Sequence, residues 1–206
     1  MMDRGRLEAF SDGVFAVAIT LLALNLAVAG PGRDHHTLLY QLGHQWPAYV
    51  AYLVSFFTIG VIWVNHHALF AQVARVDRPL LFLNLLLLLF VVAIPFATST
   101  VSDYLLVGGQ DAHVAGALYA AVMEGMGLSF SLIFIHIAGH GLMTVPMTPE
   151  ESRAATLRFG VGALVYLVAF GAAFISATLV LAIAGLITTY YIFRQTPGDA
   201  GPETSE

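Results

Sequence analysis

Long runs of apolar residues, separated by short polar segments, dominate the pattern of this chain. A helix needs about 20 apolar residues to cross a hydrocarbon core of roughly 30 Å. Runs of that length occupy residues 7–29, 46–71, 79–102, 113–139, 154–174 and 175–194. Apolar and polar positions do not alternate along them, as they would in the strands of a membrane β-barrel. The pattern therefore predicts an all-α integral membrane protein with six transmembrane helices.

The basic residues agree with an even number of spans. All eight are arginines. With six spans, only Arg33 lies on one side, and the other side holds Arg4, Arg6, Arg75, Arg78, Arg153, Arg158 and Arg194. Basic residues concentrate on the cytoplasmic side of membrane proteins, so we expect both termini in the cytoplasm. The weak boundary at 171–176 leaves five spans as an alternative, but five spans would lose this asymmetry.

Composition narrows the class of protein further. Hydrophobic residues make up 58% of the chain and charged residues 10%, and the mean hydropathy is +0.81. Residues 1–194 are therefore expected to form one transmembrane domain in a lipid bilayer, and the proline, glycine and acids of 195–206 predict a disordered cytoplasmic tail. The absence of cysteine excludes disulfides, and a net charge of −5 argues against a nucleic-acid partner.

Polar residues within the predicted spans gather at one depth, near the predicted cytoplasmic side. They come from four spans and comprise Arg6, Ser11, Asp12, Trp63, Asn65, His66, His67, Asn84, His136 and His140. A carboxylate in a membrane helix needs donors nearby, and Trp63 and His66, spaced i, i+3, are suitable donors for Asp12. The layer is either a structural clamp that fixes helix packing, the simpler interpretation, or a proton or ion site.

The first span carries a second surface that points elsewhere. At about 100° per residue, Val17, Thr20 or Leu21, and Leu24 form one stripe, and Asp12 points roughly 140° away from Val17. The stripe is apolar apart from one hydroxyl. Its periodicity is also typical of lipid contact or helix packing, so periodicity alone does not identify a pore.

Two other features carry chemistry in principle. Glu124 lies near the middle of the fourth span, where it is either a neutral acid hydrogen-bonded to a neighbouring backbone or a proton-sensitive site. His136 and His140 have the i, i+4 spacing of a metal-chelating pair, but no third ligand accompanies them in the sequence. We therefore expect neither a metal ion nor another cofactor.

The first span begins with Arg6-x-x-x-Phe10-Ser11-Asp12, followed by Gly-Val-Phe-Ala-Val-Ala-Ile-Thr-Leu-Leu. This motif resembles the first-helix signature of the transmembrane protein 175 family, the endolysosomal potassium channels and their bacterial relatives. The resemblance extends through Trp63-x-x-His66-His67-x-x-Phe70 and from Asn84-Leu85 to Pro95-Phe96, and its motifs cover about half of the chain. Animal members have two six-helix repeats. The single set here is similar to the bacterial form, which assembles as a homotetramer.

The resemblance implies a potassium-permeable cation channel in the cell (inner) membrane, with potassium as the permeant ion and the first helix lining a central pore. It places the apolar constriction at Val17, Thr20, Leu21 and Leu24. It also implies a polar network that joins the first three helices and consists of Arg6, Phe10, Ser11, Asp12, Trp63, His66, His67 and Asn84.

The chain lacks the Thr-Val-Gly-Tyr-Gly loop whose carbonyls replace the hydration shell of potassium. We therefore expect only modest selectivity for potassium over sodium, set by pore width and partial dehydration, and we expect no catalytic residue. One alternative is an ion- or proton-coupled secondary transporter, which Glu124 and Pro95 would suit. The other is a membrane enzyme that uses Ser11 and Asp12 beside His66.

Overall fold

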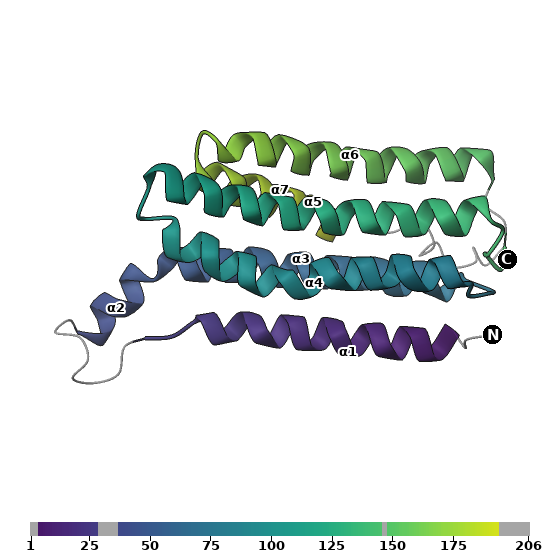
Figure 1. Cartoon of the computed structure of the whole chain (residues 1–206), viewed down its shortest axis with the longest axis horizontal. Coiled ribbons are helices and arrows are strands. Elements are labelled where there is room, and N and C mark those ends of the chain that lie inside the picture. The colour runs from purple at the N-terminus through teal and green to yellow at the C-terminus, as the bar shows by residue number, and fades with distance from the viewer. Residues whose placement is uncertain (1–3, 29–36, 146–147, 194–206) are drawn as a thin grey trace, which may run out of the picture.

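The apolar runs form a bundle of antiparallel helices in the computed structural model (Figure 1). The structure describes residues 4–28, 37–145 and 148–193. In chain order these contain α1 (Arg4–Leu22) with the 3-10 turn η1 (Ala23–Asn25), α2 (Leu38–His44), α3 (Trp46–Ala71), α4 (Arg78–Tyr104), α5 (Gly109–Gly139), α6 (Pro149–Ala173) and α7 (Ala177–Phe193). The prediction of an all-α fold is confirmed.

The long helices coincide with the six predicted runs, whereas the short helix α2 was not predicted. Within the described residues, four helices are long and apolar enough to cross a membrane, namely α1 with η1, α3, α4 and α5. The apolar part of α6 (Leu164–Ala173) and α7 are shorter. A membrane crossing by α6 and α7 therefore stays a prediction, and the predicted tail at 195–206 lies outside the described residues.

The helix boundaries follow from local sequence. The carboxylate of Asp77 accepts a hydrogen bond from the backbone N–H of Leu80 and caps the start of α4. Gly108, which precedes α5, and Gly109, its first residue, have φ angles of 72° and 65°. Residues with a Cβ rarely adopt such angles, so this tight turn depends on glycine.

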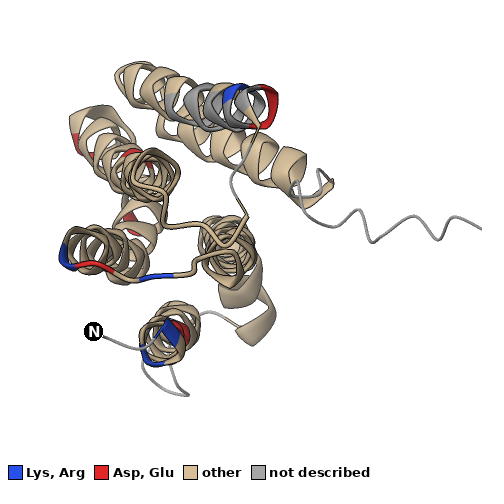
Figure 2. Cartoon of the chain, turned by 90° about the vertical axis from the view of Figure 1, so that its right-hand side faces the viewer, with Lys and Arg blue, Asp and Glu red and all other residues tan. Residues whose placement is uncertain are grey.

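The packing places α1 at the edge of the bundle. The largest contact joins α4 to α5, α6 covers α5, and α7 lies against α3, α5 and α6. Helix α1 packs against α3 and α4 through one side only (Figures 1 and 2). We call the end of the bundle where α1 begins the basal end.

The loops at the basal end are tied together. Val73, between α3 and α4, forms a β-bridge with Met143, between α5 and α6. The backbone N–H of Ala74 donates to the carbonyl of Leu142 at 2.7 Å. The arginines coloured in Figure 2 also lie at this end, at the starts of α1, α4 and α6. Arg33 and Arg194 fall outside the described residues, and the side of the membrane that the basal end faces stays a prediction.

Candidate functional site

Three fully buried polar side chains link α1, α3 and α4, and we call them the polar layer: Ser11, His66 and Asn84. Ser11 donates its only hydroxyl proton to the carbonyl of Leu7 at 2.9 Å, so its Oγ must accept from the amide of Asn84, also at 2.9 Å. The amide oxygen of Asn84 then accepts from Nε2 of His66 at 2.8 Å. These bonds fix both the orientation of the amide and the proton on Nε2.

Aromatic rings enclose the imidazole of His66. Phe70 stacks on it with ring centroids 4.1 Å apart, and Phe15 of α1 lies at 5.5 Å. The second ring nitrogen, Nδ1, is buried and has no hydrogen-bond partner within the part of the chain that the structure describes. His66 is therefore held by one strong bond and by packing, which is typical of a structural histidine.

Of the two donors expected for Asp12, namely Trp63 and His66, only Trp63 binds it. Nε1 of Trp63 donates to its Oδ1 at 2.8 Å, whereas His66 turns toward Asn84. The expected contact between Asp12 and Trp63 is therefore present, and a hydrogen bond from His66 to Asp12 is not. Asp12 is half-buried, beside the polar layer rather than inside it.

Three residues expected in this network lie outside it. Phe10 is 52% exposed, Arg6 is exposed, and His67 is exposed, with its ring 6.2 Å from that of Trp63. Within the described part of the chain, no hydrogen bond or ion pair joins Arg6 to the polar layer. These three residues therefore do not take part in the hydrogen bonds of the polar layer within one subunit, and their place in a wider network that holds the first three helices together stays a prediction.

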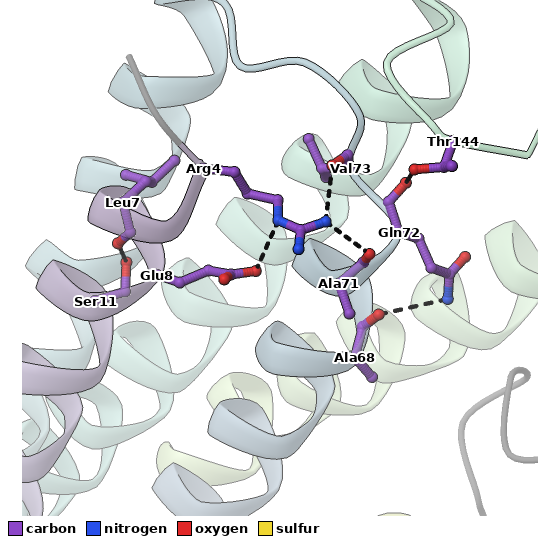
Figure 3. Close-up of polar contacts among 9 residues, drawn as sticks. All are labelled: Arg4, Leu7, Glu8, Ser11, Ala68, Ala71, Gln72, Val73 and Thr144. Atoms are coloured by element: carbon purple, nitrogen blue, oxygen red, sulfur yellow. Dashed lines mark hydrogen bonds and ion pairs between the residues drawn. The ribbon is translucent and has the colours of Figure 1, made fainter.

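Arg4, which sequence reasoning missed, joins the start of α1 to the end of α3. Its Nη1 donates to the carbonyls of Ala71 and Val73 at 3.0 and 3.2 Å, and its Nε lies 3.5 Å from Glu8 (Figure 3). The guanidinium thus binds carbonyls left without helical partners at the end of α3. Its i, i+4 spacing from Glu8 was the one signal in the sequence.

The opposite side of α1 is uncovered, and we call it the open face: Val17, Thr20, Leu21 and Leu24. Val17 is 55% exposed, Leu21 40% and Leu24 73%, whereas Ala18 and Leu22 between them are fully buried. The hydroxyl of Thr20 donates to the carbonyl of Val17 at 2.8 Å. The oxygen of that hydroxyl can still accept hydrogen bonds. It is the polar group that the side chains of this otherwise apolar stripe present.

A chain of hydroxyls in the core was also missed. Thr98 of α4 donates to the carbonyl of Ile94 at 2.7 Å. Each hydroxyl has one proton, so Ser55 of α3 must donate to Thr98 at 2.7 Å. Tyr119 of α5 then donates to Ser55 at 3.1 Å. The chain has a fixed direction and binds three helices together.

A second pair of hydroxyls, with proton directions fixed in the same way, joins α3 to α7. Thr58 donates to the carbonyl of Val54 at 2.7 Å, so Thr188 of α7 donates to Thr58 at 2.6 Å. The sequence signal was the i, i+3 pair of hydroxyls at Ser55 and Thr58 within an apolar span.

His136 faces a carboxylate at the basal end. Its Nε2 lies 3.0 and 2.9 Å from the two carboxylate oxygens of Asp77, and the ring of His140 lies 4.3 Å from its own. Desolvation acts to raise the pKa of Asp77, but the hydrogen bonds from Leu80 and His136 outweigh it, so that pKa lies below its usual value. Among the described residues, no group of three or more ligands is suited to a metal ion.

The chain is similar to known proteins both in sequence and in fold. The sequence model of the family described as endosomal/lysosomal potassium channel TMEM175 matches residues 6–95. A potassium channel of Streptomyces collinus is 48% identical over 201 residues, 96% of this chain and 95% of that protein. A potassium channel of Chamaesiphon minutus is 37% identical over 199 residues, 93% of this chain and 95% of that protein.

A solved structure is similar over almost the same length. It is the crystal structure of a lysosomal potassium-selective channel TMEM175 homolog from Chamaesiphon minutus, with a TM-score of 0.81 and 38% identity. The similarity covers 92% of this chain and 96% of that chain. The polar layer and the open face of α1 both lie within the residues that the family model matches.

Proposed function

Because this chain belongs to the TMEM175 family of potassium channels, we propose that it forms a potassium-permeable cation channel in which the open face of α1 lines the pore. The relatives are ion channels and not enzymes. The geometry agrees, because Ser11 donates to a backbone carbonyl and Asn84 stands between it and His66. An enzymatic nucleophile would need a base in direct contact.

The exposure of α1 carries the proposal. Val17 and Leu21 of α1 are 55% and 40% exposed, and Leu24, in the turn η1 that continues α1, is 73% exposed on the same side. One subunit does not enclose this face, because α1 packs on α3 and α4 with its other side. In a homotetramer with α1 helices around a central axis, the same stripe would form successive rings along the pore.

The composition of these rings supports modest selectivity for potassium over sodium. Val17, Leu21 and Leu24 offer no ligands, so an ion passing them must keep or lose hydration water without compensation. Potassium is larger than sodium and loses water more easily. Thr20, whose proton is committed to the carbonyl of Val17, would present acceptor lone pairs to the ion.

The polar layer has a structural role in this proposal. It fixes α1 against α3 and α4 where Ser11, His66 and Asn84 meet. These bonds would prevent α1 from rotating about its axis, so the open face would keep its direction. The basal end, with its arginines, would face the cytoplasm of the cell, and the protein would lie in the cell (inner) membrane.

Current across a planar bilayer that contains the purified protein tests the proposal, with potassium on one side and sodium on the other. We expect discrete currents that reverse on the potassium-selective side. Leu24→Ala should change the unitary current, whereas Leu186→Ala should not, because Leu186 is 72% exposed but lies on α7. Slow flux without discrete currents would favour the coupled transporter. Identical unitary currents in both variants would contradict the pore assignment.

A further inference from the structure

Asn25 is a polar side chain of the first predicted span that lies outside the polar layer. It belongs to the turn η1, which continues α1 at the end opposite the basal end. Its Nδ2 donates to the carbonyl of Pro95, inside α4, at 3.2 Å. Glu124 of α5 also lies outside the polar layer, but its buried Oε2 has no hydrogen-bond partner among the described residues. Asn25 therefore differs from Glu124 in bonding to another helix.

The acceptor of this bond is the carbonyl of a proline inside a helix. Pro95 is buried, and a carbonyl oxygen has two lone pairs, so it can serve α4 and Asn25 together. Apolar side chains cannot replace such a contact, because a hydrogen bond between membrane helices requires a polar group on one helix and a partner on the other. The bond therefore marks a specific point of attachment between η1 and α4.

This bond is a second polar attachment of α1 to α4. The first is the bond between Ser11 and Asn84, and Asn25 follows Ser11 by fourteen residues, about 20 Å of helix. The side of α1 between the two attachments is fully buried and apolar, and it consists of Phe15, Ala18 and Leu22. Apolar contacts between helices in lipid depend on shape alone. The polar contacts at both ends therefore fix the height and the rotation of α1 on α4.

The geometry of the turn couples Asn25 to Leu24. Side chains three residues apart lie in line in a 3-10 helix, so Asn25 follows the buried Leu22 and Leu24 follows the exposed Leu21. The backbone N–H of Leu26 closes the turn on the carbonyl of Ala23 at 3.1 Å. Hydrogen bonds of 3-10 helices have poor geometry. The turn that carries Leu24 is therefore stabilised by the bond that Asn25 makes to α4.

The residues after the turn are attached to the bundle as well. Gln45, at the start of α3, donates through its Nε2 to the carbonyl of Ala27. Two side-chain amides thus join η1 and the residues after it to α4 and to α3, the helices on which α1 packs. Both contacts hold the segment from the bundle side, and Leu24 projects from its exposed side.

We propose that Asn25 is a positioning residue of the pore, whose bond to Pro95 holds Leu24 on the open face and so sets the pore width at the end opposite the basal end. The inference rests on the proposed function, because Asn25 acts through the ring that Leu24 would form and not on the ion itself. A single interhelical hydrogen bond contributes little to the stability of a whole bundle. Its loss should therefore change conduction more than folding.

Asn25→Leu tests this proposal, because leucine keeps the branching of the side chain but cannot donate a hydrogen bond. The chain has no cysteine, so Ala23→Cys places one thiol in the turn for a nitroxide label. Electron paramagnetic resonance then measures the mobility of the label in the full chain in lipid, diluted with unlabelled chain. Separate samples without the label give the unitary potassium current in a planar bilayer.

We expect Asn25→Leu to raise the rotational rate of the label at least about twofold and to change the unitary current at least about twofold. The thermal unfolding temperature should stay close to that of the unchanged chain. Asn25→Gln keeps an amide donor and should restore part of both values. Thr100→Val removes a hydroxyl that donates within α4 and should change neither.

Unchanged label mobility in Asn25→Leu would overturn the proposal, because the bond would then not hold the turn. Higher mobility with an unchanged current would also overturn it, since the turn would move without affecting the pore. Failure of the proposed channel is recognised separately, from an unchanged chain that carries no current. That result would refute the pore and the positioning role together, while the label would still report whether Asn25 attaches the turn to α4.

Discussion

Replacing Asn84 by leucine should loosen the attachment of α1 and α3 to α4. The side chain donates to Ser11 and accepts from His66, and all three groups are fully buried. Leucine has the same branching and number of side-chain heavy atoms as asparagine, so the change removes two interhelical hydrogen bonds and keeps the shape of the side chain, although its methyl groups are larger.

The two losses differ in size. Ser11 keeps its bond to the carbonyl of Leu7 and loses only an accepted bond, for which interhelical bonds in membranes average about 0.6 kcal/mol. His66 loses the only partner of Nε2, and an unsatisfied buried donor costs about 1–3 kcal/mol. The free energy of unfolding should therefore fall by about 2–4 kcal/mol in Asn84→Leu, the sum of these two losses.

Unfolding in mixed detergent micelles measures this change, and a double-mutant cycle identifies its cause. His66→Phe keeps a ring against Phe70 but leaves the oxygen of Asn84 without a donor. The double variant His66→Phe/Asn84→Leu leaves neither group unpaired, so it should be at least about 1 kcal/mol more stable than the sum of the single changes predicts.

A control lies on the same helix. Thr100 donates only to the carbonyl of Phe96 within α4, so Thr100→Val should change stability by less than about 0.5 kcal/mol. The reasoning is refuted if Asn84→Leu is as mild as this control, or if the two single changes simply add.

Three further outcomes follow from the structure. Thr20→Val removes the hydroxyl of the open face at nearly constant size, so the potassium-to-sodium permeability ratio, measured by reversal potential, should fall. Arg4→Gln should weaken the attachment of the first turn of α1 to the end of α3 by about 1 kcal/mol. Hydrogen exchange of the backbone amides in that turn should then become about fivefold faster, whereas Arg6→Gln should change neither quantity. The pKa of Asp77 is lowered in the folded protein, so its contribution to stability is present above the unfolded value of about 3.9 and is lost as pH falls below it. The unfolding temperature of Asp77→Asn should therefore decline less on acidification than that of the unchanged chain, and parallel declines would contradict this.

The apolar runs predicted the long helices because each run is long, continuous and bounded by charge or by turn residues. The sequence missed α2, because Leu38–His44 is too short to show a helical period against the apolar residues around it. The rotation of α1 was predictable from spacing alone, which separates Val17 from the side that carries Ser11.

The partners within the polar layer were less predictable than its members. An i, i+3 spacing predicts that Trp63 and His66 share one side of α3. It does not predict that one turns to Asp12 on α1 and the other to Asn84 on α4. Arg4 was missed for a similar reason, since its acceptors are backbone carbonyls at the end of α3 and no residue type marks them.

The one-sided attachment of α1 also has a consequence for how subunits would assemble into a conducting oligomer in a membrane. The open face is almost wholly apolar, so a lone subunit can leave it against lipid tails without a large penalty. Dispersed subunits and closed rings would then exchange by mass action, and dilution in lipid would remove conduction without unfolding any chain. In a homotetramer, conductance at low protein density would rise with about the fourth power of subunit density.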